Sequence, residues 1–210
     1  MVEQLLKATG ETFYMVFFSG FLSLLFGLPL GVLLYITSRS EGKKKIYFVL
    51  DTLVNIFRSI PFIILVLLLI PLTKVLIGTI IGSNAAIFNL TIAAIPFMAR
   101  LAENSFNTLP SGIIDSARSL GTTNWQFISK VLIPETLPDQ ISNFSVMLIN
   151  LVTYTAIAGA VGAGGLGQLA INYGYYRFQW DVVLYCVIIL VLISQLIQFA
   201  GKKISTNLRK

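Results

Sequence analysis

The sequence predicts an all-α integral membrane protein with five membrane-spanning helices, and three observations indicate this class. First, only 11% of the 210 residues are charged, whereas a soluble domain carries about a quarter. Second, residues 12–38, 75–99, 140–176 and 182–201 contain no charge, and about 20 apolar residues cross a bilayer as a helix. Third, lysine and arginine gather in the connections expected on one side of the membrane.

We expect a single transmembrane domain over residues 8–202. Its five spans are expected near residues 12–37, 54–73, 84–101, 140–162 and 182–201. The uncharged runs define four of these spans directly, because a charge at the centre of a spanning helix costs about 2.5–3.5 kcal/mol. The chain therefore has no separate soluble domain in this interpretation.

The second span is the least obvious, because Arg58 and Lys74 bracket an uncharged run that is too short to cross alone. We expect residues 52–57 to extend this helix, which places Arg58 one turn inside, snorkelling or facing the protein. In an alternative interpretation, the amphipathic run 46–57 lies at the inner interface and turns into the span at Ser59-Ile60-Pro61.

The distribution of positive charge predicts the orientation. With five spans and an outer N-terminus, 12 of the 15 lysine and arginine residues lie on the inner side. The outer side then holds only Lys7, Lys74 and Arg177. This bias predicts an outer N-terminus and a cytoplasmic C-terminus. The net charge of +6 is therefore attributed to topology and to attraction for anionic membrane lipid, and no nucleic-acid partner is expected.

Few residues in this chain are suited to catalysis. The chain has no histidine and one cysteine, Cys186, which excludes imidazole bases, an internal disulfide and histidine-based zinc sites. It also lacks the G-x-x-x-x-G-K-[ST] loop that cradles nucleotide phosphates. We expect no enzyme activity, no metal and no cofactor in this chain. The predicted spans lack mid-span ionisable residues, which disfavours an ion-coupled carrier.

The longest polar connection, residues 102–139, lies on the inner side in this topology. Residues 113–121 predict a short helix that ends at Gly121. A solvated loop and a docking element for another subunit are both compatible with such a segment. The spacing of its residues distinguishes the two.

A second helix is expected to start after this glycine, with Thr123 or Asn124 as its N-cap. Pro134 and Pro138 are expected to interrupt helical structure where the chain returns to the membrane.

The spacing resembles the cytoplasmic motif of ABC-importer permeases, which reads Glu-Ala-Ala, three residues, Gly, nine residues, Ile, one residue, Leu-Pro. Seven residues occupy its positions with the spacing intact: Asp115, Ser116, Ala117, Gly121, Val131, Ile133 and Pro134. Ala117, Gly121 and Pro134 are identical to the motif, and the other four are conservative replacements. The resemblance implies that these seven residues dock an ATPase subunit.

Three further stretches, residues 54–65, 159–168 and 198–201, are similar to methionine-import permeases. The resemblance covers essentially the whole chain and implies the type I ABC importer permease fold in a bacterial inner (plasma) membrane. It implies a homodimer, with two ATPase subunits that bind ATP-Mg and a substrate-binding lipoprotein. The implied function is ATP-driven import of methionine or close derivatives by alternating access. The alternative is a stand-alone channel or a secondary carrier for a small solute.

The fourth span is expected to carry the translocation path. Asn150, Thr153 and Ile157 share one helical face, and Tyr154 and Val161 share the neighbouring face. Ordinary packing between helices is the alternative role for these residues. The resemblance implies that the stretch lines the path, where two copies of Ile157 would meet as an apolar gate.

A glycine cluster follows this span and comprises Gly159, Gly162, Gly164, Gly165 and Gly167. It satisfies the dinucleotide-binding pattern G-x-G-x-x-G, but that pattern needs a preceding strand and a parallel sheet. A hydrophobic helix precedes it here. We therefore expect close backbone packing, or an unwound helix end that faces the outer cavity.

Overall fold

The computed structural model describes residues 1–209, and every regular element in this range is helical, which confirms the all-α prediction. In chain order the elements are α1 (Val2–Ser38), η1 (Glu41–Lys43), α2 (Lys44–Ser59), α3 (Phe62–Ile77), α4 (Ser83–Asn107), α5 (Ser111–Ser119), α6 (Asn124–Phe127), η2 (Ile128–Leu132), α7 (Ile133–Gly159), α8 (Gly165–Ala170), η3 (Ile171–Tyr175) and α9 (Trp180–Leu208).

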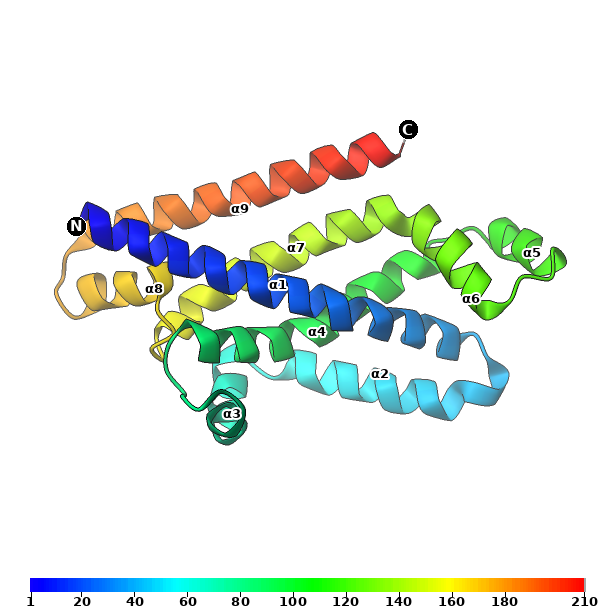
Figure 1. Ribbon diagram of the computed structural model, residues 1–210, viewed down its shortest axis with the longest axis horizontal. Helices are drawn as coiled ribbons and strands as arrows, with labels where there is room; N and C mark the ends of the chain where they lie inside the picture. The colour runs from blue at the N-terminus through cyan, green and yellow to red at the C-terminus, as the bar shows by residue number, and fades with distance from the viewer. Residues whose placement is uncertain (210) are drawn as a thin grey trace.

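The long helices run lengthwise along the molecule, as Figure 1 shows for α1, α7 and α9. The N-terminus and α8 lie at one end, and α5 and α6 lie at the other. Four helices are long and apolar enough to cross a membrane, namely α1, α4, the continuous helix 124–159 and α9. The bent pair formed by α2 and α3 makes a fifth candidate span.

Small residues of α1 let it pack closely against α4. A Cβ added at Gly27 would lie 2.8 Å from the Cβ of Met98, and one at Gly31 would lie 2.7 Å from the carbonyl oxygen of Ala99. Glycines four residues apart present one flat face of a helix, and helices in membranes associate through such faces. The two glycines therefore set the distance between α1 and α4.

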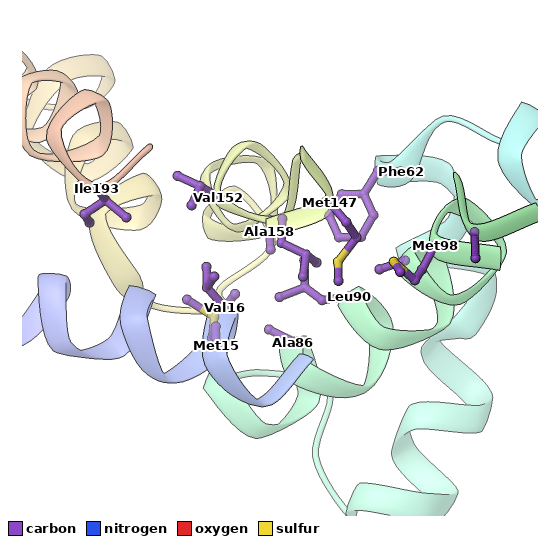
Figure 2. Close-up of a cluster of buried hydrophobic side chains, with 14 of the residues drawn as sticks. Met15, Val16, Phe62, Ala86, Leu90, Met98, Met147, Val152, Ala158 and Ile193 are labelled. Atoms are coloured by element: carbon purple, nitrogen blue, oxygen red, sulfur yellow. The ribbon is translucent and has the colours of Figure 1, made fainter. Parts of the chain in front are cut away.

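Apolar side chains from α1, α3, α4, α7 and α9, among others, meet in one core (Figure 2). Met15 of α1, Leu90 and Met98 of α4 and Met147 of α7 are fully buried there. Phe62 at the start of α3 and Ile193 of α9 lie at opposite sides of the same cluster. This core holds α7, the expected path helix, against α1 and α4.

The second span is not the continuous helix expected over residues 54–73. The chain breaks at Ile60-Pro61, and α2 and α3 meet at 108°. Proline disfavours the helical conformation in the residue before it, and Ile60 is accordingly extended, with ψ of 123°. The alternative turn at Ser59-Ile60-Pro61 is therefore the one observed, although α2 lies lengthwise beside α4 and does not cross the inner end of the bundle.

Two expected boundaries in the inner connection also differ. α4 continues to Asn107, so the connection is shorter than residues 102–139. Pro134 and Pro138 do not break the helix, because residues 124–159 are helical throughout. A π-helical turn at Ile128–Leu132 ends two residues before Pro134, which lies in the first turn of α7. A wide turn of this kind accommodates the missing N–H and the ring of a proline.

Candidate functional site

The predicted docking segment projects from the end of the bundle opposite the N-terminus (Figure 1). Ile114 and Ala117 bury one side of α5 against the protein, while Asp115 and Ser116 are exposed on the other side. A spacing of three residues places Ile114 and Ala117 on one face of the helix, and Asp115 and Ser116, which lie between them in the sequence, point away from that face. The first part of the motif therefore has an outward-facing surface carried by an anchored helix.

Gly121 is required by the backbone at this position. Its φ is +70°, and a Cβ added there would meet nothing within 4 Å. Its N–H donates to the carbonyl oxygen of Arg118 at 2.9 Å, which closes the end of α5. Residues with a side chain rarely adopt such a φ. Gly121 is therefore required for its positive φ, and not because a neighbouring atom leaves no room for a side chain.

The next helix begins with a capping box, which resolves the two expected N-caps in favour of Thr123. The Gln126 N–H donates to Thr123 Oγ1 at 3.3 Å, and the Thr123 N–H donates to Gln126 Oε1 at 2.9 Å. This reciprocal pair satisfies two N–H groups that would otherwise be unpaired at the helix start. It fixes the direction in which α6 leaves the turn.

Two exposed apolar residues beside this turn were not predicted as docking residues. Leu120 is 83% exposed and Trp125 is 74% exposed. Their position beside the predicted docking turn makes them candidates for a contact with another protein. A signal was present in the sequence, because these are the bulky apolar residues nearest Gly121. Val131 and Ile133 are half-buried in the helix that follows, and Pro134 is exposed.

The two predicted faces of α7 differ in exposure. Ile157 is 37% exposed and Thr153 is also exposed, while Asn150 is half-buried. This first face is open in the single chain. On the neighbouring face, the Tyr154 ring stacks on Phe62 at a centroid distance of 4.6 Å, and Val161 packs against the core.

A small cavity connects this helix with the break between α2 and α3. Its volume is about 160 Å³, and its lining includes Arg58, Phe97, Asn150 and Tyr154. The Arg58 guanidinium carbon lies 5.8 Å from the centre of the Phe97 ring. Arg58 is exposed, but its guanidinium contacts the protein at Phe97, in line with one of the two roles expected for it. Its position beside the predicted path residues depends on the chain break and was not predicted.

The glycine cluster forms a tight hairpin between α7 and α8. A Cβ at Gly159 would lie 2.2 Å from the Gln168 nitrogen, and one at Gly167 would lie 2.4 Å from the Ala156 carbonyl oxygen. Gly162, Gly164 and Gly165 all have positive φ. The element before the cluster is helix α7, whereas a dinucleotide-binding motif follows a strand. The cluster therefore packs helices together and is not a nucleotide site.

Glu11 and Thr12 of α1 cap the start of α8. The Gly165 N–H donates to Glu11 Oε2 at 2.8 Å, and the Leu166 N–H donates to Thr12 Oγ1 at 3.0 Å. Carboxylate and hydroxyl oxygens commonly satisfy the free N–H groups of a helix start. These contacts join residues more than 150 positions apart, which is why the sequence did not reveal them.

A buried charge cluster joins α2 and α4 at the ends of the expected spans, and none of its residues lies at mid-span. Arg100 forms ion pairs with Asp51 and, at 2.6 Å, with Glu103. It also donates to Asn55 Oδ1 at 3.1 Å. Glu103 is only 2% exposed, so its charge depends on these partners.

The chain is similar to known proteins over nearly its whole length. Residues 14–210 match the family described as binding-protein-dependent transport system inner membrane component. The chain is 44% identical over 202 residues to the probable D-methionine transport system permease protein MetI of Vibrio cholerae, which covers 95% of this chain and 89% of that protein. It is 46% identical over 161 residues to the D-methionine transport system permease protein MetI of Escherichia coli K12, covering 76% and 74% of the two chains.

Solved structures agree with these sequence relatives. A chain of the MetNI methionine ABC transporter, solved in inward-facing conformations, superposes with a TM-score of 0.97 at 45% identity, covering 99% of this chain and 97% of that one. An amino acid ABC transporter solved with histidines superposes with a TM-score of 0.79 at 17% identity, covering 98% and 94%, and shares the fold. This chain therefore belongs to the family of binding-protein-dependent transport system inner membrane components, the membrane permeases of ABC importers.

Proposed function

We propose that this chain is the membrane permease of an ATP-driven methionine importer that accepts the D-isomer. The observation that carries the proposal is the match, over 99% of the chain, to the permease of a methionine ABC transporter. The names of the relatives at 43–47% identity support the D-isomer as a substrate. Free energy comes from ATP bound with Mg²⁺ and hydrolysed in a separate ATPase subunit.

Two copies of the chain pair with two ATPase subunits in this proposal, and a substrate-binding lipoprotein delivers methionine at the outer side. The docking surface includes the exposed motif residues Asp115, Ser116, Gly121 and Pro134, with Leu120 and Trp125 beside the turn. These two apolar side chains would be buried in a groove of the ATPase. The resulting contact transmits the ATPase movement into α5 and, through the capped turn at Thr123, into the helix that ends in α7.

The translocation path follows the open face of α7. Alternating access requires a seal that one rigid-body movement opens. Ile157 provides the seal when two copies meet at the dimer axis, because an apolar constriction excludes water. The cavity beside this face suits an amino acid with an apolar side chain, since Arg58 offers a partner for a carboxylate, and Phe62 and Phe97 offer rings for a thioether.

The alternative of a stand-alone channel or secondary carrier is disfavoured by the exposed docking surface, which would have no use in either. A transport assay separates the possibilities. The chain is expressed with its ATPase and lipoprotein in bacteria that lack their own methionine importers, and uptake of labelled D- and L-methionine is measured. We expect uptake that an ATPase variant unable to hydrolyse ATP abolishes. Uptake that persists with that variant would favour the carrier or channel.

A further inference from the structure

A basic cavity lies between the inner end of α1 and the docking segment, and no role considered above uses it. Its volume is about 260 Å³. Six of its lining residues are charged or carry a hydroxyl group: Tyr35, Arg39, Ser40, Lys43, Arg118 and Thr122. The first four come from α1 and η1 or the residues between them, and the last two come from α5 and the turn after it. The cavity therefore has walls from two parts of the chain.

Three cations in this cavity lack a counterion. Arg39, Lys43 and Arg118 form no ion pair within residues 1–209, and no acidic residue lines the cavity. Glu41 lies nearby in the sequence but is exposed and outside the lining. Three positive charges held around one cavity repel one another, so a bound anion would stabilise the arrangement.

The positive-inside bias alone does not account for this arrangement. Lys44 and Lys45 follow Lys43 directly, and all three are exposed, yet only Lys43 lines the cavity. Lysine and arginine residues that only set the orientation in the membrane can lie anywhere on the inner connections. The fold instead brings Arg118 of α5 to two cations that are more than 70 positions away in the sequence.

A buried hydroxyl provides a second and independent observation. Tyr35 is 2% exposed, and its hydroxyl has no hydrogen-bond partner among the described residues. The Arg39 guanidinium carbon lies 4.8 Å from the centre of the Tyr35 ring. Buried hydroxyl groups are normally hydrogen-bonded, and leaving one unpaired costs about 1–3 kcal/mol. An acceptor in the cavity would remove this cost.

We propose that this cavity binds a phosphate group. A phosphate offers several acceptor oxygens to Arg39, Lys43 and Arg118, and one of its oxygens can accept a hydrogen bond from the Tyr35 hydroxyl. Tyr35 lies in the last turn of α1, at the inner end of the bundle, and basic pockets between helices at this level bind lipid headgroups. The phosphate comes either from an anionic phospholipid or from free inorganic phosphate. Either one bridges the end of α1 to the docking segment.

Binding is tested on the full-length protein, extracted into uncharged detergent in the complex that it forms in cells and freed of lipid. Its thermal unfolding is followed during titration with short-chain phosphatidylglycerol, matched phosphatidylcholine, inorganic phosphate, or chloride at equal ionic strength. We expect saturable stabilisation by phosphatidylglycerol, by inorganic phosphate, or by both. Saturation by phosphatidylglycerol at a much lower concentration identifies a lipid headgroup, and equal or better saturation by inorganic phosphate identifies the free ion.

Adjacent lysines provide a matched pair of variants. Lys43→Gln is expected to weaken the binding about tenfold, as is Arg118→Gln, because each removes one charge-assisted bond. Lys44→Gln removes the same charge one residue away and should leave the affinity within about twofold. Tyr35→Phe should weaken binding about fivefold, while the ligand-free protein unfolds at the same or a higher temperature.

Two results would overturn the assignment. One is stabilisation by phosphatidylcholine or chloride equal to that by phosphatidylglycerol and inorganic phosphate, or no saturable stabilisation at all. The absence of saturable stabilisation is also expected if a carboxylate of a partner subunit already fills the cavity. The other is equal loss of binding in Lys43→Gln and Lys44→Gln, which would assign the effect to general surface charge. Neither result bears on methionine transport, so the phosphate site and the proposed function stand or fall separately.

Discussion

Arg100 of α4 forms an ion pair with Asp51 of α2, and thereby fastens the bent second span to the centre of the bundle. The same guanidinium holds Glu103, one turn further along α4, at 2.6 Å. Both acidic groups share one cation, so the cluster depends on Arg100. Arg100 and Glu103 lie in the last third of α4, the helix that leads to the docking segment.

Replacing this shared cation should be strongly destabilising. In Arg100→Met, buried Glu103 loses its partner, and breaking a buried ion pair on one side costs about 3–5 kcal/mol. The control is Arg209→Met, which removes the exposed pair with Asp139 and should cost about 1 kcal/mol or less. Thermal unfolding in detergent measures both variants. Equal unfolding temperatures for the two would contradict a structural role for the buried cluster.

The positive φ of Gly121 makes the docking turn sensitive to side-chain shape. Gly121→Val should remain in the membrane but lower ATP-coupled uptake about tenfold or more, because a β-branched residue is strained by about 1–3 kcal/mol at this φ. Gly121→Asn should retain most uptake, since asparagine tolerates the left-handed region. Uptake per membrane-inserted protein is the measurement.

A charge change on the same surface provides a comparison. Asp115→Lys alters an exposed residue of α5 that makes no ion pair in the described part of the chain. Exposed pairs contribute about 1 kcal/mol or less, so this variant should be milder than Gly121→Val. Full uptake in Gly121→Val would refute the docking role of the turn.

The open position of Ile157 predicts a gate. Ile157→Gly should raise ATP-independent leak of methionine through proteoliposomes at least about fivefold, because it removes the apolar group that excludes water. Ile157→Leu keeps the volume and should keep the seal. The assay is tracer efflux without ATP. If the glycine variant leaks no more than the parent, the seal lies at another residue.

Orientation is tested by cysteine labelling in a Cys186→Ser background. The charge bias places Lys74 outside and Lys203 inside. Lys74→Cys should react with an impermeant thiol reagent in intact cells, while Lys203→Cys should react only after the cells are opened. The reverse pattern of labelling would invert the topology.

The sequence alone predicted the features that neighbouring residues determine. Uncharged runs located the long helices, and Gly121 and Thr123 predicted the end of one short helix and the start of the next. The context of the glycine cluster excluded a nucleotide site, and close backbone packing was one of the two roles expected for it.

The remaining features depend on contacts between distant parts of the chain. The 108° bend at Pro61 brings Arg58 beside Asn150, and hydropathy alone cannot distinguish a bent span from a straight one. Asp51, one of the two carboxylate partners of Arg100, lies 49 residues away on another helix. Pro134 continues a helix because a π turn precedes it, whereas the usual rule predicts a break.

The most direct test of the account is methionine uptake into proteoliposomes that contain the chain and its ATPase, with the binding protein supplied at the outer side. The rate is compared between ATP and a non-hydrolysable analogue inside the vesicles, for the parent and for Gly121→Val. The account predicts uptake by the parent with ATP alone, and near loss of uptake in Gly121→Val. Equal uptake by the parent with ATP and with the analogue would contradict an ATP-driven importer.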